Sequence, residues 1–170
     1  MPTAGTSPTT PLLRITVPRR IEASPEEVFD AWADPDLFRR WFEPHRAILR
    51  KAAVDELWYW EADHAGRLWA HYCRYLRVER PRLLEFAWMS EATRGLESRV
   101  IVEMTPSRDA TDLVLTHTGL PDDEWGRGHE EGWTHFTGIL AETIQGLRRG
   151  AGTARACRDR TRSSPPALAR

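Results

Sequence analysis

The sequence predicts an α+β fold in which a curved antiparallel sheet of six or seven strands wraps around a long C-terminal helix, with two short helices after the first strand. Hydrophobic residues alternate with a period of two through most of the middle of the chain, which is typical of strands with one buried face. Glycine and proline residues leave only short joins between these segments, which favours antiparallel pairing of consecutive strands. Near the C-terminus the period changes to three or four residues, which is typical of an amphipathic helix.

The N-terminal part of the domain predicts one strand and two short helices. The alternation from Leu13 to Val17 predicts the first strand. Ser24-Pro25-Glu26-Glu27 has the residues of a helix start, because the serine can cap the helix, proline suits the first helical position and the second glutamate completes a capping box. Asp34-Pro35 predicts the start of the second short helix, with the aspartate as its cap.

Five or six further strands are expected before the long helix. The alternating segments are Glu56–Glu61, Leu68–Val78, Leu84–Trp88, Val100–Met104 and Leu113–His117. A turn through Asp63–Gly66 joins the first two of them. Because the remaining joins are also short, we expect a meander of neighbouring strands.

The last predicted element is a long helix with one apolar stripe. The stripe consists of Trp133, Phe136, Leu140, Ile144 and Leu147. Acidic residues at 122–124 lie where the helix dipole favours negative charge. The concave face of the sheet is the only large apolar surface that this stripe can cover.

Charge divides the 170-residue chain, whose formal net charge is -1, into unequal parts. Residues 148–170 carry seven arginines and one acid, a charge of +6, which leaves -7 for residues 12–147. We therefore expect a disordered N-terminal tail over residues 1–11, one folded domain over 12–147, and a flexible basic tail over 148–170. The tail is either simply solvated or contacts RNA or a membrane.

Composition excludes several classes of protein. Only Cys73 and Cys157 are present, too few for a disulfide framework or a four-cysteine zinc site. No segment approaches the roughly 18 apolar residues of a membrane-spanning helix, and no secretory signal is recognisable, so we expect a cytoplasmic protein. Lys51 is the only lysine among 24 basic residues, which indicates a GC-rich bacterial genome. Because much of the arginine excess lies in the tail, nucleic-acid binding by the domain is not expected.

Several short segments resemble one known family in their order and spacing. They are Ile21–Trp32 with Asp34-Pro35 and Trp41-Phe42, Glu79–Leu83 before Trp88, Leu115–His117 with Gly119-Leu120, and His129 with Gly132-Trp133. Together they resemble a helix-grip domain of the SRPBCC superfamily, which has the START and birch-pollen-allergen fold. The resemblance is closer still to its AHSA-type branch, named for the activator of the heat-shock chaperone ATPase, and covers about residues 12–147. That branch usually has a Gly-Gly pair where this chain has Lys51-Ala52-Ala53. Whether the chain makes a tight bend there is therefore left open.

The resemblance implies a cavity between sheet and long helix that holds a hydrophobic or aromatic small molecule. The eight tryptophans agree with an aromatic lining, although each one alone can equally fill the core. Trp58 and Trp60 share one strand face and Leu57 and Tyr59 the other, and the pattern does not say which pair faces inward. The expected ligand-binding residues are Trp41, Trp58, Trp60, Tyr72, Phe86, Trp88, His117, His129, Trp133 and Phe136.

Three residues are candidates for catalysis, namely His117, Tyr72 and Glu61. His117 continues the inward face of its strand, and a histidine that titrates near neutral pH can shuttle protons. Two of the candidates have a structural alternative. His117 can be a hydrogen-bonded core histidine, and Glu61 an exposed strand charge.

Metal, nucleotide and other cofactor sites are not expected. His129–Trp133 resembles the zinc-protease helix motif, but a tryptophan stands where the second histidine must be. Gly126-Arg127-Gly128 begins like a dinucleotide-binding loop and then continues to Glu131 instead of glycine. We expect Gly132 to allow a close approach of the helix to the sheet or the ligand.

These features leave three functions open. The first is binding of a hydrophobic or aromatic small molecule by a carrier, sensor or sequestering resistance protein. The second is a polyketide cyclase or aromatase-like enzyme that uses a histidine, tyrosine or glutamate of the cavity. The third is a co-chaperone-like stress protein, as the name of the resembling branch suggests. A homodimer is compatible with each of them.

Overall fold

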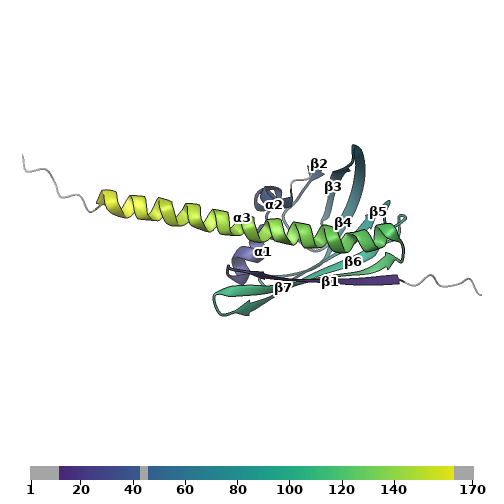
Figure 1. Cartoon of the computed structure of the whole chain (residues 1–170), viewed down its shortest axis with the longest axis horizontal. Helices are drawn as coiled ribbons and strands as arrows, with labels where there is room; N and C mark the ends of the chain where they lie inside the picture. The colour runs from purple at the N-terminus through teal and green to yellow at the C-terminus, as the bar shows by residue number, and fades with distance from the viewer. Residues whose placement is uncertain (1–11, 43–45, 163–170) are drawn as a thin grey trace, which may run out of the picture.

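An open antiparallel sheet, seven-stranded within the described residues, curves around one side of a long helix (Figure 1). The computed structural model describes residues 12–42 and 46–162, of which 152–162 are described as helical backbone only. The elements are β1 (Leu12–Ile21), α1 (Pro25–Ala33), α2 (Pro35–Phe42), β2 (Arg46–Ile48), β3 (Leu57–His64), β4 (Arg67–Glu79), β5 (Leu83–Ser90), β6 (Ser98–Ser107), β7 (Ala110–Pro121) and α3 (Glu124–Arg162). The sheet order is β1-β7-β6-β5-β4-β3-β2. The predicted α+β helix-grip architecture is confirmed.

The starts of both short helices follow the local sequence. The Ser24 hydroxyl accepts from the Glu27 backbone N–H at 3.3 Å, and the Glu27 carboxylate accepts from the Ser24 N–H at 2.9 Å. The Asp34 carboxylate accepts from the backbone N–H groups of Asp36 and Leu37 at 2.9 and 3.1 Å. Both caps satisfy N–H groups that have no partner within their own helix.

One strand was not expected, and one helix ends later than expected. β2 was not predicted, because three residues at the edge of a sheet are too few to show a period. Helix α3 continues to Arg162 instead of ending near Leu147, since no proline interrupts it and alanine and arginine favour helix. Residues 1–11 lie outside the described residues, and the domain boundary at 147 stays a prediction. Among the described helices, none is both long and apolar enough to cross a membrane.

Helix α3 crosses the concave side of the sheet near β1 and β7, and its C-terminal part projects beyond the sheet (Figure 1). Gly126 is needed at its first turn, because a Cβ there would lie 1.8 Å from the Pro121 carbonyl oxygen. The expectation that Gly132 allows a close approach to the sheet is wrong, since a Cβ at Gly132 would meet nothing within 4 Å, whereas an approach to a ligand there stays a prediction. The helix thus leaves room on the side of β3, β4 and β5, which aromatic side chains only partly fill.

An aromatic core lies beneath α1 and α2. Trp32 packs edge-on against Trp41 with ring centroids 4.7 Å apart, and Phe38 packs against Trp41 at 5.0 Å. Trp58 joins this group through Phe38 at 5.6 Å. Full burial of one such side chain contributes roughly 1.5–3 kcal/mol, so this cluster fixes α1 and α2 against the sheet.

Candidate ligand-binding pocket

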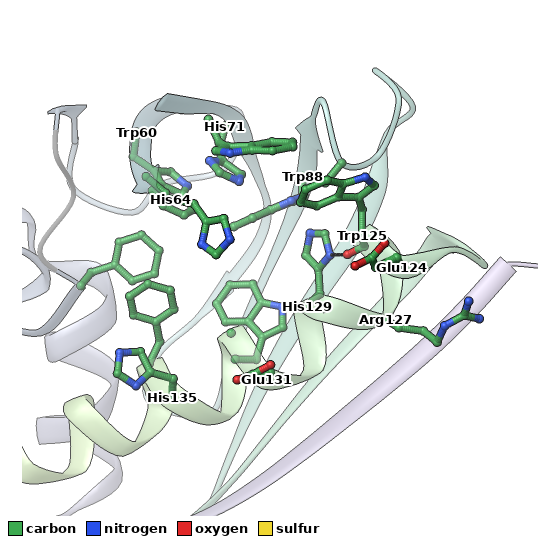
Figure 2. Close-up of a pocket in the computed structure, with 18 residues that line it drawn as sticks. Trp60, His64, His71, Trp88, Glu124, Trp125, Arg127, His129, Glu131 and His135 are labelled. Atoms are coloured by element: carbon green, nitrogen blue, oxygen red, sulfur yellow. Dashed lines mark hydrogen bonds between the residues drawn. The ribbon is translucent and has the colours of Figure 1, made fainter. Parts of the chain in front are cut away.

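A pocket of about 760 Å³ lies between the concave face of β3, β4 and β5 and the first half of α3 (Figure 2). Its volume is that of a small-molecule site, typically about 300–1,000 Å³. Seven aromatic side chains line it, namely Phe42, Trp60, Trp69, Trp88, Trp125, Trp133 and Phe136. Four imidazoles line it as well, those of His64, His71, His129 and His135.

Ring-to-ring packing holds the pocket walls in place. Trp60 stacks on His71 with centroids 3.9 Å apart and planes within 8°. Phe42, from the end of α2, contacts Phe136 of α3 at 4.5 Å and thereby links the two helices at one end of the pocket. Since flat rings already pack against one another here, a further flat ring finds faces and edges suited to offset or edge-on contact.

Five of the ten expected ligand-binding residues line the pocket. They are Trp60, Trp88, His129, Trp133 and Phe136. They come from β3, β5 and α3, three elements far apart in sequence that face the same space (Figure 2). Whether they contact a ligand stays a prediction.

Three of the expected tryptophan and phenylalanine residues belong to the core instead. Trp41 is fully buried, and its indole N–H donates to the Ala31 carbonyl at 2.8 Å. Trp58 points inward like Trp60 but lies two residues nearer the short helices, where Phe38 and Phe86 cover it. Phe86 is 1% exposed and lies within the same cluster. These three therefore do not line the pocket.

Two candidate catalytic residues lie on the outer face of the sheet. Because Trp58 and Trp60 point inward, Tyr59 and Glu61 point outward, and Tyr72 pairs with Tyr59 across the strands. The Tyr59 hydroxyl donates to the Glu61 carboxylate, which raises the pKa of Tyr59 to about 12. Tyr72 is 54% exposed on this face. Neither Glu61 nor Tyr72 reaches the pocket, so we do not propose them as site residues.

The third candidate, His117, is buried in a complete hydrogen-bond chain behind the pocket wall. The Trp133 indole N–H donates to its Nδ1 at 3.0 Å, so the proton of the neutral ring is on Nε2. Nε2–H then donates to the Ser98 hydroxyl at 2.8 Å, and that hydroxyl donates to the Trp88 carbonyl at 2.9 Å. Burial lowers the pKa of His117 well below 6.5, and nearby His129 lowers it further. This histidine positions Trp133 and does not line the pocket itself.

The two more deeply buried imidazoles of the pocket lining, those of His71 and His129, are neutral at pH 7. Burial lowers the pKa of His71 to about 3, with a further contribution from His129. Burial also lowers the pKa of His129, while the Trp125 and Gly126 backbones and Asp123 oppose that shift. The inner pocket therefore has no cationic histidine at neutral pH.

A few buried polar atoms of the wall have no hydrogen-bond partner among the described residues. They include the indole nitrogens of Trp69 and Trp88 and Nδ1 of His71. Buried polar groups normally find a partner, in protein or in ordered water. The wall is thus apolar in area but carries unused hydrogen-bonding groups.

Several lining residues were not among the ten expected ligand-binding residues, above all His64, His71, Trp69 and Trp125. Strand parity would have found the first two. His64 lies four residues after Trp60 on the same face of β3, and His71 pairs with Trp60 in the register of β3 and β4. Trp125 precedes His129 by one helical turn. Each assignment needs the inward face to be known first, and the alternation alone does not say which face that is.

The fold and the pocket together define a helix-grip domain of the SRPBCC superfamily. Within it, residues 22–145 match the family described as activator of Hsp90 ATPase homolog 1-like protein, and the chain belongs to this family. The AHSA-type resemblance is thereby confirmed. Among curated proteins the comparison finds no match.

Solved structures with the same fold come from several bacteria. Protein MLL2253 from Mesorhizobium loti is 25% identical, with a TM-score of 0.68 over 78% of this chain and 97% of that one. CalU16 from Micromonospora echinospora is 26% identical, with a TM-score of 0.59 over 85% and 86%. DynU16, a protein of the dynemicin biosynthetic locus, is 22% identical, with a TM-score of 0.64 over 78% of this chain and 47% of that one.

Proposed function

We propose that the protein binds a hydrophobic or aromatic small molecule in the pocket between β3–β5 and α3, as a carrier, a sensor or a sequestering protein. The observation that carries this proposal is the 760 Å³ pocket with its lining of seven aromatic side chains. Burial of a flat apolar molecule in such a pocket contributes a favourable free energy of about 25 cal/mol per Å² of apolar surface removed from water. Aromatic contacts of good geometry add roughly 0.5–1.5 kcal/mol each.

A polyketide cyclase-like enzyme is the alternative, and the geometry of His129 favours it. Its Nδ1 is held by the Trp125 carbonyl at 2.9 Å while the ring lines the pocket. An imidazole oriented in this way can act as a general base. The biosynthetic locus of DynU16 makes such a reaction worth testing. An enzyme converts the bound compound, whereas a carrier or sensor releases it unchanged.

Two glycines of α3 supply a matched pair of variants for testing the pocket. A Cβ meets nothing within 4 Å at Gly132, which lines the pocket, or at Gly146, which lies on the same helix outside it. Phenylalanine at either position relieves a similar part, about 0.5 kcal/mol, of the glycine helix penalty. Gly132→Phe places its ring in the pocket, and Gly146→Phe does not.

The test is a fluorescence titration with N-phenyl-1-naphthylamine, a neutral aromatic probe whose emission rises in apolar surroundings. We expect saturable binding of one probe by the wild-type chain and by Gly146→Phe, and at least tenfold weaker binding by Gly132→Phe. Equal binding by all three proteins, or none by the wild type, contradicts the proposal.

A further inference from the structure

One imidazole of the pocket has its tautomer fixed by a backbone carbonyl. His129 Nδ1 lies 2.9 Å from the Trp125 carbonyl oxygen, one turn earlier in α3. A carbonyl oxygen can only accept a hydrogen bond, so Nδ1 carries the proton. The neutral ring therefore presents Nε2 as an acceptor, with a lone pair and no hydrogen.

No group of the described protein uses that acceptor. Nε2 of His129 makes no hydrogen bond among the described residues, and it is not among their fully covered polar atoms. Figure 2 shows the His129 ring rising from α3 into the space below His71 and Trp88. The acceptor is therefore open to the pocket.

The adjacent histidine cannot supply the missing donor. The rings of His117 and His129 are 5.1 Å apart and nearly perpendicular. His117 already uses both nitrogens, one toward Trp133 and the other toward Ser98. The two neighbours thus hold opposite tautomers, and only that of His129 leaves an acceptor for another molecule.

We propose that the ligand is an aromatic compound with a hydroxyl group, and that this hydroxyl donates a hydrogen bond to His129 Nε2. The proposal rests on the proposed ligand-binding function and adds the chemical class of the ligand. Aromatic walls select the ring, and the fixed acceptor of His129 selects a donor on its edge. A neutral imidazole nitrogen accepts well from a phenolic O–H.

A pair of probes that differ in one hydrogen-bond donor tests this assignment. Isothermal titration calorimetry compares 2-naphthol with 2-methoxynaphthalene, whose methyl ether cannot donate. We expect the wild-type chain to bind 2-naphthol about five- to tenfold more tightly, the ratio that one net hydrogen bond gives. His129→Phe keeps a ring but removes the acceptor, so the ratio of the two affinities falls to about one. His129→Gln, whose amide oxygen can accept, restores part of the ratio.

Glu130→Phe is the matched control, because it introduces the same side chain at an exposed position of α3 outside the pocket. It should keep the wild-type ratio. Equal affinity of the wild-type chain for both probes overturns the inference and leaves the pocket function intact. Failure of both probes to bind contradicts the proposed function itself.

Long-range ¹H–¹⁵N correlation NMR of the imidazoles tests the same inference without a ligand. We expect the Nδ1–H tautomer for His129 and the Nε2–H tautomer for His117. The signal that disappears in His129→Phe identifies the residue. An Nε2–H tautomer at His129 overturns the inference whatever the probes do.

Discussion

His117→Leu separates a structural histidine from a catalytic one. The substitution removes the acceptor of the Trp133 indole N–H and the donor to the Ser98 hydroxyl, at a site with 0% exposure. A buried donor left without a partner costs about 1–3 kcal/mol. At pH 7.5 we therefore expect the free energy of unfolding to fall by about 2–3 kcal/mol, or roughly 4–12 °C in Tm.

The stability difference between the wild-type chain and His117→Leu should depend on pH. Burial holds the pKa of His117 in the folded state well below 6.5, so below that pH the unfolded chain binds a proton that the folded chain does not. Wild-type stability therefore falls as the pH drops below 6.5 toward the folded pKa. The variant has no such loss, so the gap between the two proteins should be smaller at pH 5 than at pH 7.5.

Urea denaturation of both chains at pH 7.5 and pH 5.0 measures this gap. His135→Leu serves as the control, because His135 is exposed and no hydrogen bond of its side chain to a described residue is found. It should leave stability unchanged at both pH values. A gap that stays constant with pH, or wild-type stability of His117→Leu at pH 7.5, refutes the reasoning.

Three further predictions address other contacts. Ser24→Ala removes the side-chain half of the capping box with Glu27 and should lower the free energy of unfolding by about 1 kcal/mol in urea; no change would contradict the cap. Trp133→Phe keeps an aromatic wall but leaves His117 Nδ1 without its donor, so the same assay should show a loss of about 1–2 kcal/mol, and a neutral result would contradict the chain of hydrogen bonds. Binding of 2-naphthol should be constant from pH 7.5 to 6.5 and weaken below the pKa of His129, which burial lowers while the Trp125 and Gly126 backbones and Asp123 oppose that shift; calorimetry that shows tighter binding at acid pH would contradict the acceptor role.

The sequence predicts most of the fold because its local signals agree with one another. The caps at Ser24 and Asp34 lie where the helices begin, and the period-two segments become β3 to β7. β2 and the far end of α3 escape prediction, since β2 is too short for a period and α3 continues through Gly150 and Gly152, which usually indicate a helix end. Boundaries of this kind depend on what packs nearby.

The site is harder to predict because tertiary packing determines two of its properties. The first is which face of β3 turns inward, which brings Trp60 and His64 to the pocket and sends Glu61 outside. The second is how deep an inward residue lies. His117 points inward as expected, but Trp133 and Trp88 lie between it and the pocket. The alternation of residues predicts which face of a strand a side chain lies on, but not how far that side chain lies from the pocket.

The open space at Gly132 reverses a sequence expectation in a useful way. Glycine there was expected to let the helix approach the sheet or a ligand, yet the close approach to backbone occurs six residues earlier, at Gly126. Gly132 instead keeps the pocket wide. Its replacement is therefore the most direct way to fill the pocket without removing a side chain.

Native mass spectrometry of the freshly purified chain tests the central claim, a pocket that binds one aromatic molecule. Wild type and Gly132→Phe are compared as isolated and again after addition of excess N-phenyl-1-naphthylamine. We expect the wild-type chain to carry one non-covalent adduct, retained from the cell or taken from the probe, and Gly132→Phe to carry much less of it at the same probe concentration. A bare wild-type mass with the probe in excess, or an adduct held equally by both proteins, contradicts the account.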